Sequence, residues 1–287
     1  MKIGAYASFM IPFSTPQTIA DLGRRMEDIG MESLWMGEHV VLFDKMEFPY
    51  PGTADGRLPV PDGHGLMDIV PTFGFLASVT KTLRFGTGVI LVPQRNPIYT
   101  AKEFATLDWL TGGRIDLGIG VGWCKEEVLA CGYGWEDRGE RCNEQLDLMI
   151  KLWTEPVTTH QGKHFQVDAC RMDPKPVQKP YIPLYVGGYS KAAIRRAARY
   201  GRGWLGFGIN PEITKTFTEG LDAALQAEGR SREDFEIIVS PGAVDADAVR
   251  AFQDLGVDRL VPVLGPQDAN AESPRMAELE GYANLVA

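Results

Sequence analysis

The stretch Pro183-Leu184-Tyr185-Val186-Gly187-Gly188-Tyr189-Ser190, which continues as Lys191-Ala192-Ala193-Ile194-Arg195-Arg196-Ala197-Ala198, has the order of a short apolar strand, two glycines, a hydroxyl cap and a helix. Glycines let the backbone approach an oxyanion closely, and a helix N-terminus offers unpaired N–H groups with a partial positive charge. Gly187, Gly188 and Ser190 therefore form a candidate phosphate site. The alternative is a plain strand-to-helix turn, because glycine pairs are common in turns.

Strand and helix patterns alternate on both sides of this unit. The predicted strands are 2–8, 33–37, 83–87 and 115–119 before it, and 204–207, 235–240 and 259–263 after it. The predicted helices are 16–29, 67–80, 99–110, 138–153, 190–200, 211–228 and 245–255. Eight strands, each followed by a helical segment except in the last unit, are the count of a closed α/β barrel, the (β/α)8 or TIM-barrel fold.

Two stretches interrupt the alternation within what we expect to be a single domain spanning residues 1–287. Residues 40–66 are rich in proline and glycine and follow the second strand at its C-terminal end, where barrel active sites lie. We expect no regular structure there, and a lid or a binding loop. Residues 158–180 contain a predicted hairpin around Gln161-Gly162-Lys163 and a proline-spaced run that should be extended.

The composition of the 287 residues excludes several classes of function. A net charge of −9 without a basic stripe argues against a nucleic-acid partner. The N-terminus lacks an apolar leader and no apolar run approaches a membrane span, so we expect a cytoplasmic protein without a membrane partner. The four cysteines lack a C-x-x-C pair, and Gly162 between His160 and His164 argues against a helical metal motif, so no metal site is expected.

Glu38 and His39 stand at the C-terminal end of the second predicted strand, at the rim of the barrel mouth. A histidine side chain changes protonation near neutral pH and can act as an acid, a base or a hydrogen-bond partner. Because of its place in the barrel, we interpret this pair as a functional site. The alternative is that His39 only packs under the 40–66 loop.

Glycines interrupt the third and fourth predicted strands close to the same mouth. Gly88 lies where the third strand should reach it, and glycine inside a strand marks a bulge or the close approach of a ligand. The fourth strand continues into Gly120-Val121-Gly122-Trp123, which does not match the G-x-G-x-x-G dinucleotide motif. These residues are either small because the barrel needs small residues there, or they place backbone against a flat ring.

Several motifs follow one another in the order and spacing of a known family, across residues 1 to about 265. They are Glu38-His39, Thr87-Gly88-Val89, Pro93-Gln94-Arg95-Asn96-Pro97, the run from Leu110 to Gly120, Arg141-Cys142-Asn143-Glu144, Leu152-Trp153-Thr154-Glu155, the run from Pro174 to Pro180, Gly187-Gly188, and Gly201-Arg202-Gly203-Trp204. Together they resemble the bacterial luciferase-like monooxygenase superfamily. The helix after Gly187-Gly188 is most similar to the branch of oxidoreductases that use the deazaflavin coenzyme F420.

The resemblance implies a role for particular residues. A non-prolyl cis peptide that backs the cofactor ring maps to Gly88-Val89, and an acid–histidine pair beside the ring maps to Glu38 and His39. The phosphate groove maps to Val186, Gly187, Gly188 and Ser190. The remaining cofactor contacts implied are Leu91, Gly120, Val121 and Gly122.

One position departs from the pattern of the family. Several deazaflavin enzymes carry a glutamate acid or base just after the glycines of the fourth strand, where this chain has Trp123, so Glu126 or Glu127 would have to substitute. The resemblance implies a homodimer that moves a hydride between coenzyme F420 and a small organic substrate. The alternatives are an FMN-dependent monooxygenase and a flavin-binding barrel without turnover.

Overall fold

The computed structural model describes residues 1–53, 55–242, 244–265 and 272–285. Within these residues, eight parallel strands form a closed barrel, because the strand order runs from β10 through β13, β1 and β3 to β7, and β7 pairs again with β10. The barrel strands are β1 (Lys2–Tyr6), β3 (Ser33–Met36), β5 (Arg84–Thr87), β7 (Ile115–Gly120), β10 (Leu184–Gly187), β11 (Gly203–Phe207), β12 (Glu236–Ser240) and β13 (Arg259–Leu260). The predicted (β/α)8 fold is confirmed.

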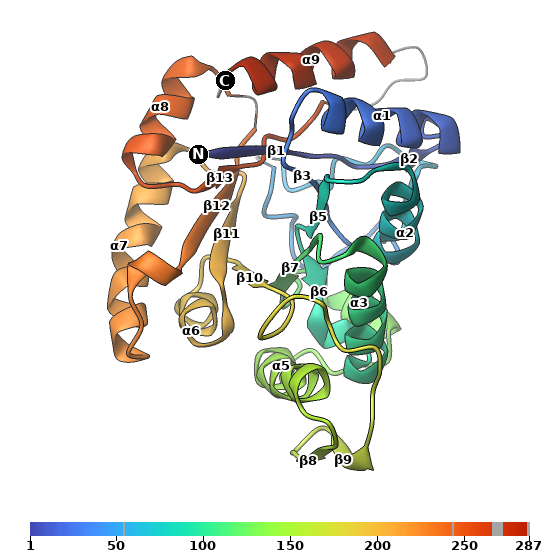
Figure 1. Ribbon diagram of the computed structural model, residues 1–287, viewed down its shortest axis with the longest axis vertical. Helices are drawn as coiled ribbons and strands as arrows, with labels where there is room; N and C mark the ends of the chain where they lie inside the picture. Colours follow the sequence, from blue (N-terminus) through green and yellow to red (C-terminus); the bar gives the residue numbers. More distant parts are fainter. Residues whose placement is uncertain (54, 243, 266–271, 286–287) are drawn as a thin grey trace.

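Helices lie around the outside of the barrel (Figure 1). They are α1 (Pro16–Asp28), α2 (Ile69–Val79), α3 (Pro97–Thr111), α4 (Lys125–Ala130), α5 (Arg138–Thr154), α6 (Lys191–Tyr200), α7 (Pro211–Ala227), α8 (Ala246–Asp254) and α9 (Glu272–Asn284), with short 3-10 turns η1 (Val92–Gln94) and η2 (Arg232–Asp234). Thr15 caps α1 by accepting the Thr18 N–H at 3.2 Å, and Pro16 occupies its first turn. No described helix is both long and apolar enough to cross a membrane.

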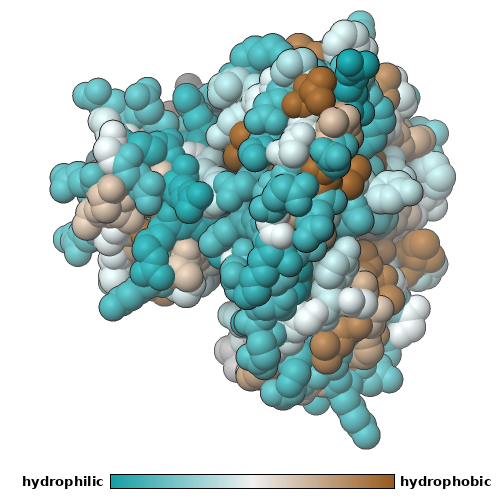
Figure 2. Space-filling view, turned by 90° about the horizontal axis from the view of Figure 1, so that it is seen from below, coloured by the Kyte–Doolittle hydropathy of each residue, from teal (hydrophilic) through white to brown (hydrophobic). Residues whose placement is uncertain are grey.

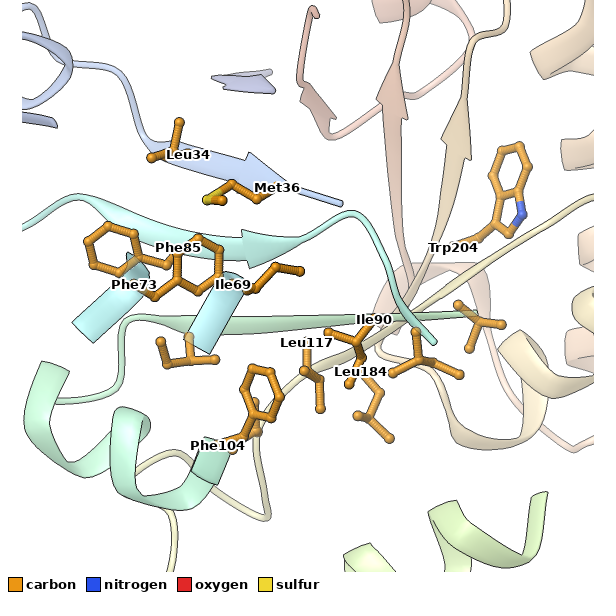
Figure 3. Close-up of a cluster of buried hydrophobic side chains, with 14 of the residues drawn as sticks. Leu34, Met36, Ile69, Phe73, Phe85, Ile90, Phe104, Leu117, Leu184 and Trp204 are labelled. Atoms are coloured by element: carbon orange, nitrogen blue, oxygen red, sulfur yellow. The ribbon is translucent and has the colours of Figure 1, made fainter. Parts of the chain in front are cut away.

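Alternation along the strands divides the apolar residues into two layers. Leu34 and Met36 of β3 belong to the large cluster between the sheet and the helices, where Phe73 of α2 packs near Phe85 of β5 (Figure 3). Trp35, between them in sequence, belongs instead to a small cluster with Tyr185, Leu205, Ile238 and Val261. The barrel interior is therefore filled by side chains, and they lie beneath its C-terminal mouth.

The third barrel strand is interrupted where the sequence predicted a bulge. After β5 the chain resumes as β6 (Ile90–Leu91), and both pair with β7. Gly86 lies opposite Asp116 and Ile90 opposite Ile119, so one extra residue is accommodated on this side. The Gly88-Val89 peptide inside the bulge is cis, as expected.

Three details of the prediction were wrong. The 40–66 stretch is not wholly irregular, because β4 (Gly65–Leu66) pairs antiparallel with β2 (Met10–Ile11). The last barrel strand ends at Leu260 rather than 263, although Val263 still bridges to Tyr6. Helix α4 was missed, because six residues are too few to show helical periodicity. The hairpin of β8 (Thr158–Gln161) and β9 (Gln166–Cys170) is confirmed.

Candidate active site

A cavity of 360 Å³ opens at the C-terminal ends of the barrel strands, between the strand ends and the 40–66 loop. Ten of the twelve predicted site residues line it: Glu38, His39, Gly88, Val89, Leu91, Gly120, Val121, Gly122, Gly187 and Gly188. The other two lie beside it. Val186 is buried within β10, and Ser190 is the N-cap of α6, where its hydroxyl accepts the Ala193 N–H at 3.1 Å.

A second cavity, of 570 Å³, lies at the opposite end of the barrel, among the first residues of the strands. Its buried centre is an ion-pair network in which Asp116 accepts from Arg84 and, at 2.7 Å, from Arg259. Burial opposes ionisation of Asp116, but Arg259 and Arg84 hold its pKa below the usual range. This end of a barrel serves stability, so we place the active site at the C-terminal mouth.

His39 is held on the wall of the 360 Å³ cavity by a carboxylate from another part of the chain. Its Nδ1 lies 2.9 Å from Oε2 of Glu127, and the Val40 N–H donates to Oε1 of the same carboxylate at 2.6 Å. Glu127 belongs to α4 and is fully buried, whereas the His39 side chain is 12% exposed. A carboxylate only accepts, so Nδ1 carries a hydrogen, and in the neutral ring Nε2 keeps its lone pair.

Glu38 has different partners from those of the neighbouring histidine. Its Oε2 accepts the Leu91 N–H at 2.7 Å, and its Oε1 forms an ion pair with Arg95. Burial raises the pKa of Glu38, while Arg95 and the Leu91 N–H act in the opposite direction. Both carboxylate oxygens are thus engaged in fixing the segment that follows Gly88-Val89, and the acid that contacts His39 is Glu127.

The floor of the cavity is built from glycine backbone and the side chain of Val89. A Cβ at Gly120 would come within 2.6 Å of Val89 Cγ2, and one at Gly187 within 2.9 Å of Val89 Cγ1. A larger residue at either position would clash with Val89. Gly120 of β7 and Gly187 of β10 therefore both lie against Val89, and backbone with one small side chain in the lining suits a flat ring.

The turn after β10 has the geometry of an anion site. Gly188 has φ of +109°, and the Trp204 indole N–H donates to its carbonyl oxygen at 3.0 Å. The turn leads directly into the N-terminus of α6, where Ser190 caps one N–H and others remain for a ligand. These observations fit a phosphate group bound at this edge of the cavity.

Aromatic rings also line the cavity. Trp123 packs edge-on against His39 and Tyr50, with ring centroids 5.8 Å and 5.2 Å away. Tyr6 packs against Phe207 at 5.1 Å. The residue that replaces the acid of some deazaflavin enzymes thus lies directly against the histidine.

Reasoning from the sequence named Glu127, with Glu126, as a possible acid, but it did not identify the contact of Glu127 with His39, nor the roles of Arg95 and Tyr50. Glu127 lies 88 residues from His39, and α4 comes beside the end of β3 because α4 follows β7, and β3 and β7 both pair with β5. The sequence feature that pointed to Glu127 was its position just after the fourth strand, because the ends of barrel strands form the functional face. Among the described residues, no group of three or more histidine, cysteine or acidic side chains is placed to hold a metal ion.

Comparison with known proteins places these features in a family. Residues 3–255 match the family model described as luciferase-like monooxygenase. A protein of Mycobacterium tuberculosis described as uncharacterised is 29% identical over 289 residues, covering 98% of both chains.

Two further proteins have named activities. The F420-dependent glucose-6-phosphate dehydrogenase of Nakamurella multipartita is 28% identical over 266 residues, which cover 90% of this chain and 73% of that protein. Among solved structures, an F420-dependent secondary alcohol dehydrogenase in complex with an F420-acetone adduct has a TM-score of 0.79 at 18% identity, covering 99% and 97% of the two chains. At that identity the likeness shows a shared fold.

Proposed function

Because the chain belongs to the luciferase-like monooxygenase family, we propose that it is an oxidoreductase that moves a hydride between coenzyme F420 and a small organic substrate. The observation that carries the proposal is the buried His39–Glu127 pair on the wall of a cavity floored by glycine backbone and Val89. This arrangement combines an oriented proton-transfer group with space for a flat ring.

The described residues fit a deazaflavin or a flavin. The Gly88-Val89 segment and Gly120 would lie against the ring, since they line the cavity together. Gly187 and Gly188, with the N-terminus of α6, would hold the phosphate. Such a cofactor, when bound, supplies the hydride donor or acceptor.

The protein's own contribution to the chemistry is to accept and return the substrate's proton. When an alcohol is oxidised, its C–H bond gives up a hydride to the cofactor, its O–H bond breaks, and a carbonyl forms. We assign the O–H proton to Nε2 of His39, because Nδ1 already donates to Glu127. The Glu127 carboxylate then stabilises the imidazolium that results, and in the reverse direction His39 returns the proton.

The choice of the deazaflavin over FMN is supported by the names of the relatives. The dehydrogenase of Nakamurella multipartita, which aligns over 90% of this chain, is described as F420-dependent. The family name, by contrast, favours oxygen chemistry on a flavin. The two assignments differ in oxygen use, because a deazaflavin reacts poorly with oxygen.

The test is turnover with and without oxygen. The purified protein, supplied with coenzyme F420 and a panel of alcohols and ketones, should change the cofactor absorbance at the same rate in air and in an anaerobic cuvette, without oxygen uptake. Turnover that requires FMN and consumes oxygen in proportion to product would instead establish the monooxygenase.

A further inference from the structure

We propose that the substrate side of the 360 Å³ cavity selects uncharged, mainly apolar molecules that carry one hydroxyl or carbonyl oxygen, and that it rejects phosphorylated and carboxylated ones. The inference deepens the proposed function and rests on it. It also separates this chain from its relative described as a glucose-6-phosphate dehydrogenase.

The described lining of the cavity contains no positively charged side chain. None of its described residues is a lysine or an arginine, and its ionisable members are Glu38, His39 and three tyrosines. A phosphate or carboxylate that leaves water for this cavity would find no side-chain charge to replace its hydration.

Two basic residues close in sequence to lining residues already have acidic partners, and a third, Arg57, is exposed and does not line the cavity. Arg95 pairs with Glu38 and, at 2.5 Å, with Glu103. Lys125, which follows Cys124 on α4, pairs with Glu47 at 2.6 Å. Recruiting either cation to a substrate would break an ion pair, and in the case of Arg95 it would leave the buried Glu38 carboxylate without its counter-charge.

The 40–66 loop supplies an apolar wall instead. Leu58, Pro59 and Val60 line the cavity from this loop, beside Tyr50 and Trp123. Burial raises the pKa values of both Tyr6 and Tyr50, so these hydroxyls stay neutral near pH 7 and add no negative charge to the wall. A hydrocarbon skeleton fits such a surface better than a sugar, whose hydroxyls would each need a partner.

His39 offers the substrate a polar atom with a defined orientation. Nε2 of His39 is the ring nitrogen that Glu127 leaves available, and His39 lies edge-on to Trp123 at the apolar wall. A single hydroxyl or carbonyl oxygen on the substrate therefore has a hydrogen-bond partner, while additional charged groups do not. The phosphate-competent turn at Gly187 and Gly188 lies on the cofactor side, where the proposed function already uses it.

Calorimetric titration with a matched pair of ligands tests the inference without depending on turnover. The pair is methyl 4-hydroxycyclohexanecarboxylate and the free 4-hydroxycyclohexanecarboxylate, which differ in charge on the same ring. Both are titrated into the protein with and without oxidised coenzyme F420. We expect the carboxylate to bind at least about tenfold more weakly than the ester.

A charge introduced into the wall should reverse the preference. Val60→Lys places an ammonium in the lining and should improve carboxylate affinity by about tenfold or more while weakening ester binding. Leu42→Lys is the matched control, because Leu42 is 40% exposed on the same loop and does not line the cavity. This control should keep the wild-type preference.

The inference is overturned if the carboxylate binds wild-type protein as tightly as the ester, or if the ester does not bind at all. It is also overturned if Val60→Lys and Leu42→Lys behave alike. Failure of the proposed function looks different, because coenzyme F420 itself would then give no binding heat, whereas the ester and carboxylate can still be compared on the protein alone.

Discussion

The two carboxylate oxygens of Glu127 contact two consecutive residues. Oε2 contacts Nδ1 of His39, and Oε1 accepts a hydrogen bond from the Val40 N–H. This contact fixes both the position of the imidazole ring and the nitrogen that carries its hydrogen. A buried carboxylate is costly unless it is paired, so a fully buried Glu127 also depends on these two donors. The residue and the histidine therefore form one unit, in which Glu127 is the positioning residue.

Replacing this carboxylate should change the chemistry more than the fold. In Glu127→Gln an amide N–H₂ faces Nδ1, which favours the tautomer with hydrogen on Nε2 and removes the acceptor that the substrate proton needs. We expect a loss of about tenfold or more in kcat, an altered pH–rate profile and nearly unchanged cofactor binding. Glu126→Gln is the control, because Glu126 contacts the Glu47 N–H instead. Equal rates in both variants would show that Glu127 is structural.

His39→Asn should behave like Glu127→Gln if His39 and Glu127 act together. The variant should still bind the cofactor but lose about tenfold or more in rate. The double variant, His39→Asn with Glu127→Gln, should cost little more than His39→Asn alone, because each substitution removes the same function. Wild-type rates across the pH range in folded His39→Asn would instead mean that the residue only packs beneath the loop.

The positions of the site residues could be predicted from the sequence better than the side chains that they contact. Glu38, His39, Gly88 and Gly188 could be placed at the mouth because strand order in a barrel determines which ends share a face. The partner of His39 could not, because adjacent residues on a strand end point to different sides, and Glu38 turns toward Arg95 while His39 turns toward α4.

At the scale of elements, Glu27 at the end of α1 ties that helix to the start of β5. Its carboxylate accepts the N–H groups of Thr82, of Lys81 at 2.8 Å and of Leu83 at 3.0 Å. Burial opposes ionisation, but these N–H groups, with the Thr82 hydroxyl, lower the pKa of Glu27 from its ordinary 4.5 to about 2.

This depressed pKa predicts an acid-dependent loss of stability. The contribution of Glu27 is present above the unfolded value of 4.5 and is lost as the pH falls toward 2. Glu27→Gln should lower stability by about 1 kcal/mol, or Tm by about 2–4 °C, at pH near 7, and by less at about pH 3. Urea denaturation at the two pH values measures this. Asp28→Asn changes an exposed neighbour and should show no such pH dependence of stability. If Glu27→Gln lowered the free energy of unfolding equally at both pH values, the proposed role of Glu27 would be wrong.

The turn between β10 and α6 gives a second prediction at this scale. Gly188 has φ of +109°, and a Cβ there would lie 3.2 Å from Ala193 Cβ. Gly188→Val should therefore weaken cofactor binding by more than about 1 kcal/mol, because the turn must shift away from its anion-binding geometry. Gly208→Val is the matched control, since Gly208 also has a positive φ, +69°, but nothing within 4 Å.

Fluorescence titration with the cofactor decides this prediction. Both variants should lose stability through backbone strain, and only Gly188→Val should lose affinity. Unchanged affinity in a folded Gly188→Val variant would mean that the phosphate binds elsewhere.

Long elements could be predicted from the sequence because apolar spacing and caps repeat over several turns. The Thr15 cap of α1 and the Ser190 cap of α6 are examples. Short elements could not, because β2, β4 and α4 owe their structure to neighbours that meet only after folding. The bulge at Gly88 was predictable, since glycine interrupts an otherwise apolar strand.

At the scale of the whole molecule, one helix presents apolar side chains to solvent. Tyr99, Trp109 and Leu110 of α3 are 71%, 60% and 71% exposed. Figure 2 shows apolar, brown groups standing out from a largely hydrophilic surface. We propose that the chain forms a homodimer through this helix, since large apolar side chains exposed on a surface are typical of protein contacts.

Sedimentation velocity tests the homodimer. The double variant Trp109→Glu with Leu110→Glu should sediment as a monomer, because two charges would face the partner subunit. Leu129→Glu alters an exposed leucine on α4 and should leave the oligomer intact. A wild-type monomer at micromolar concentration would contradict the proposal.

The most direct test of the central claim is an equilibrium titration of the purified protein with coenzyme F420 and, in parallel, with FMN, monitored by fluorescence and thermal unfolding. The cavity floored by Gly120, Gly187 and Val89, together with the His39–Glu127 pair, should bind the deazaflavin at micromolar affinity or tighter. At about 100 times the Kd, bound coenzyme F420 should raise Tm by about 5 °C, and FMN should raise it far less. Tight binding of FMN without any binding of coenzyme F420 would contradict the account.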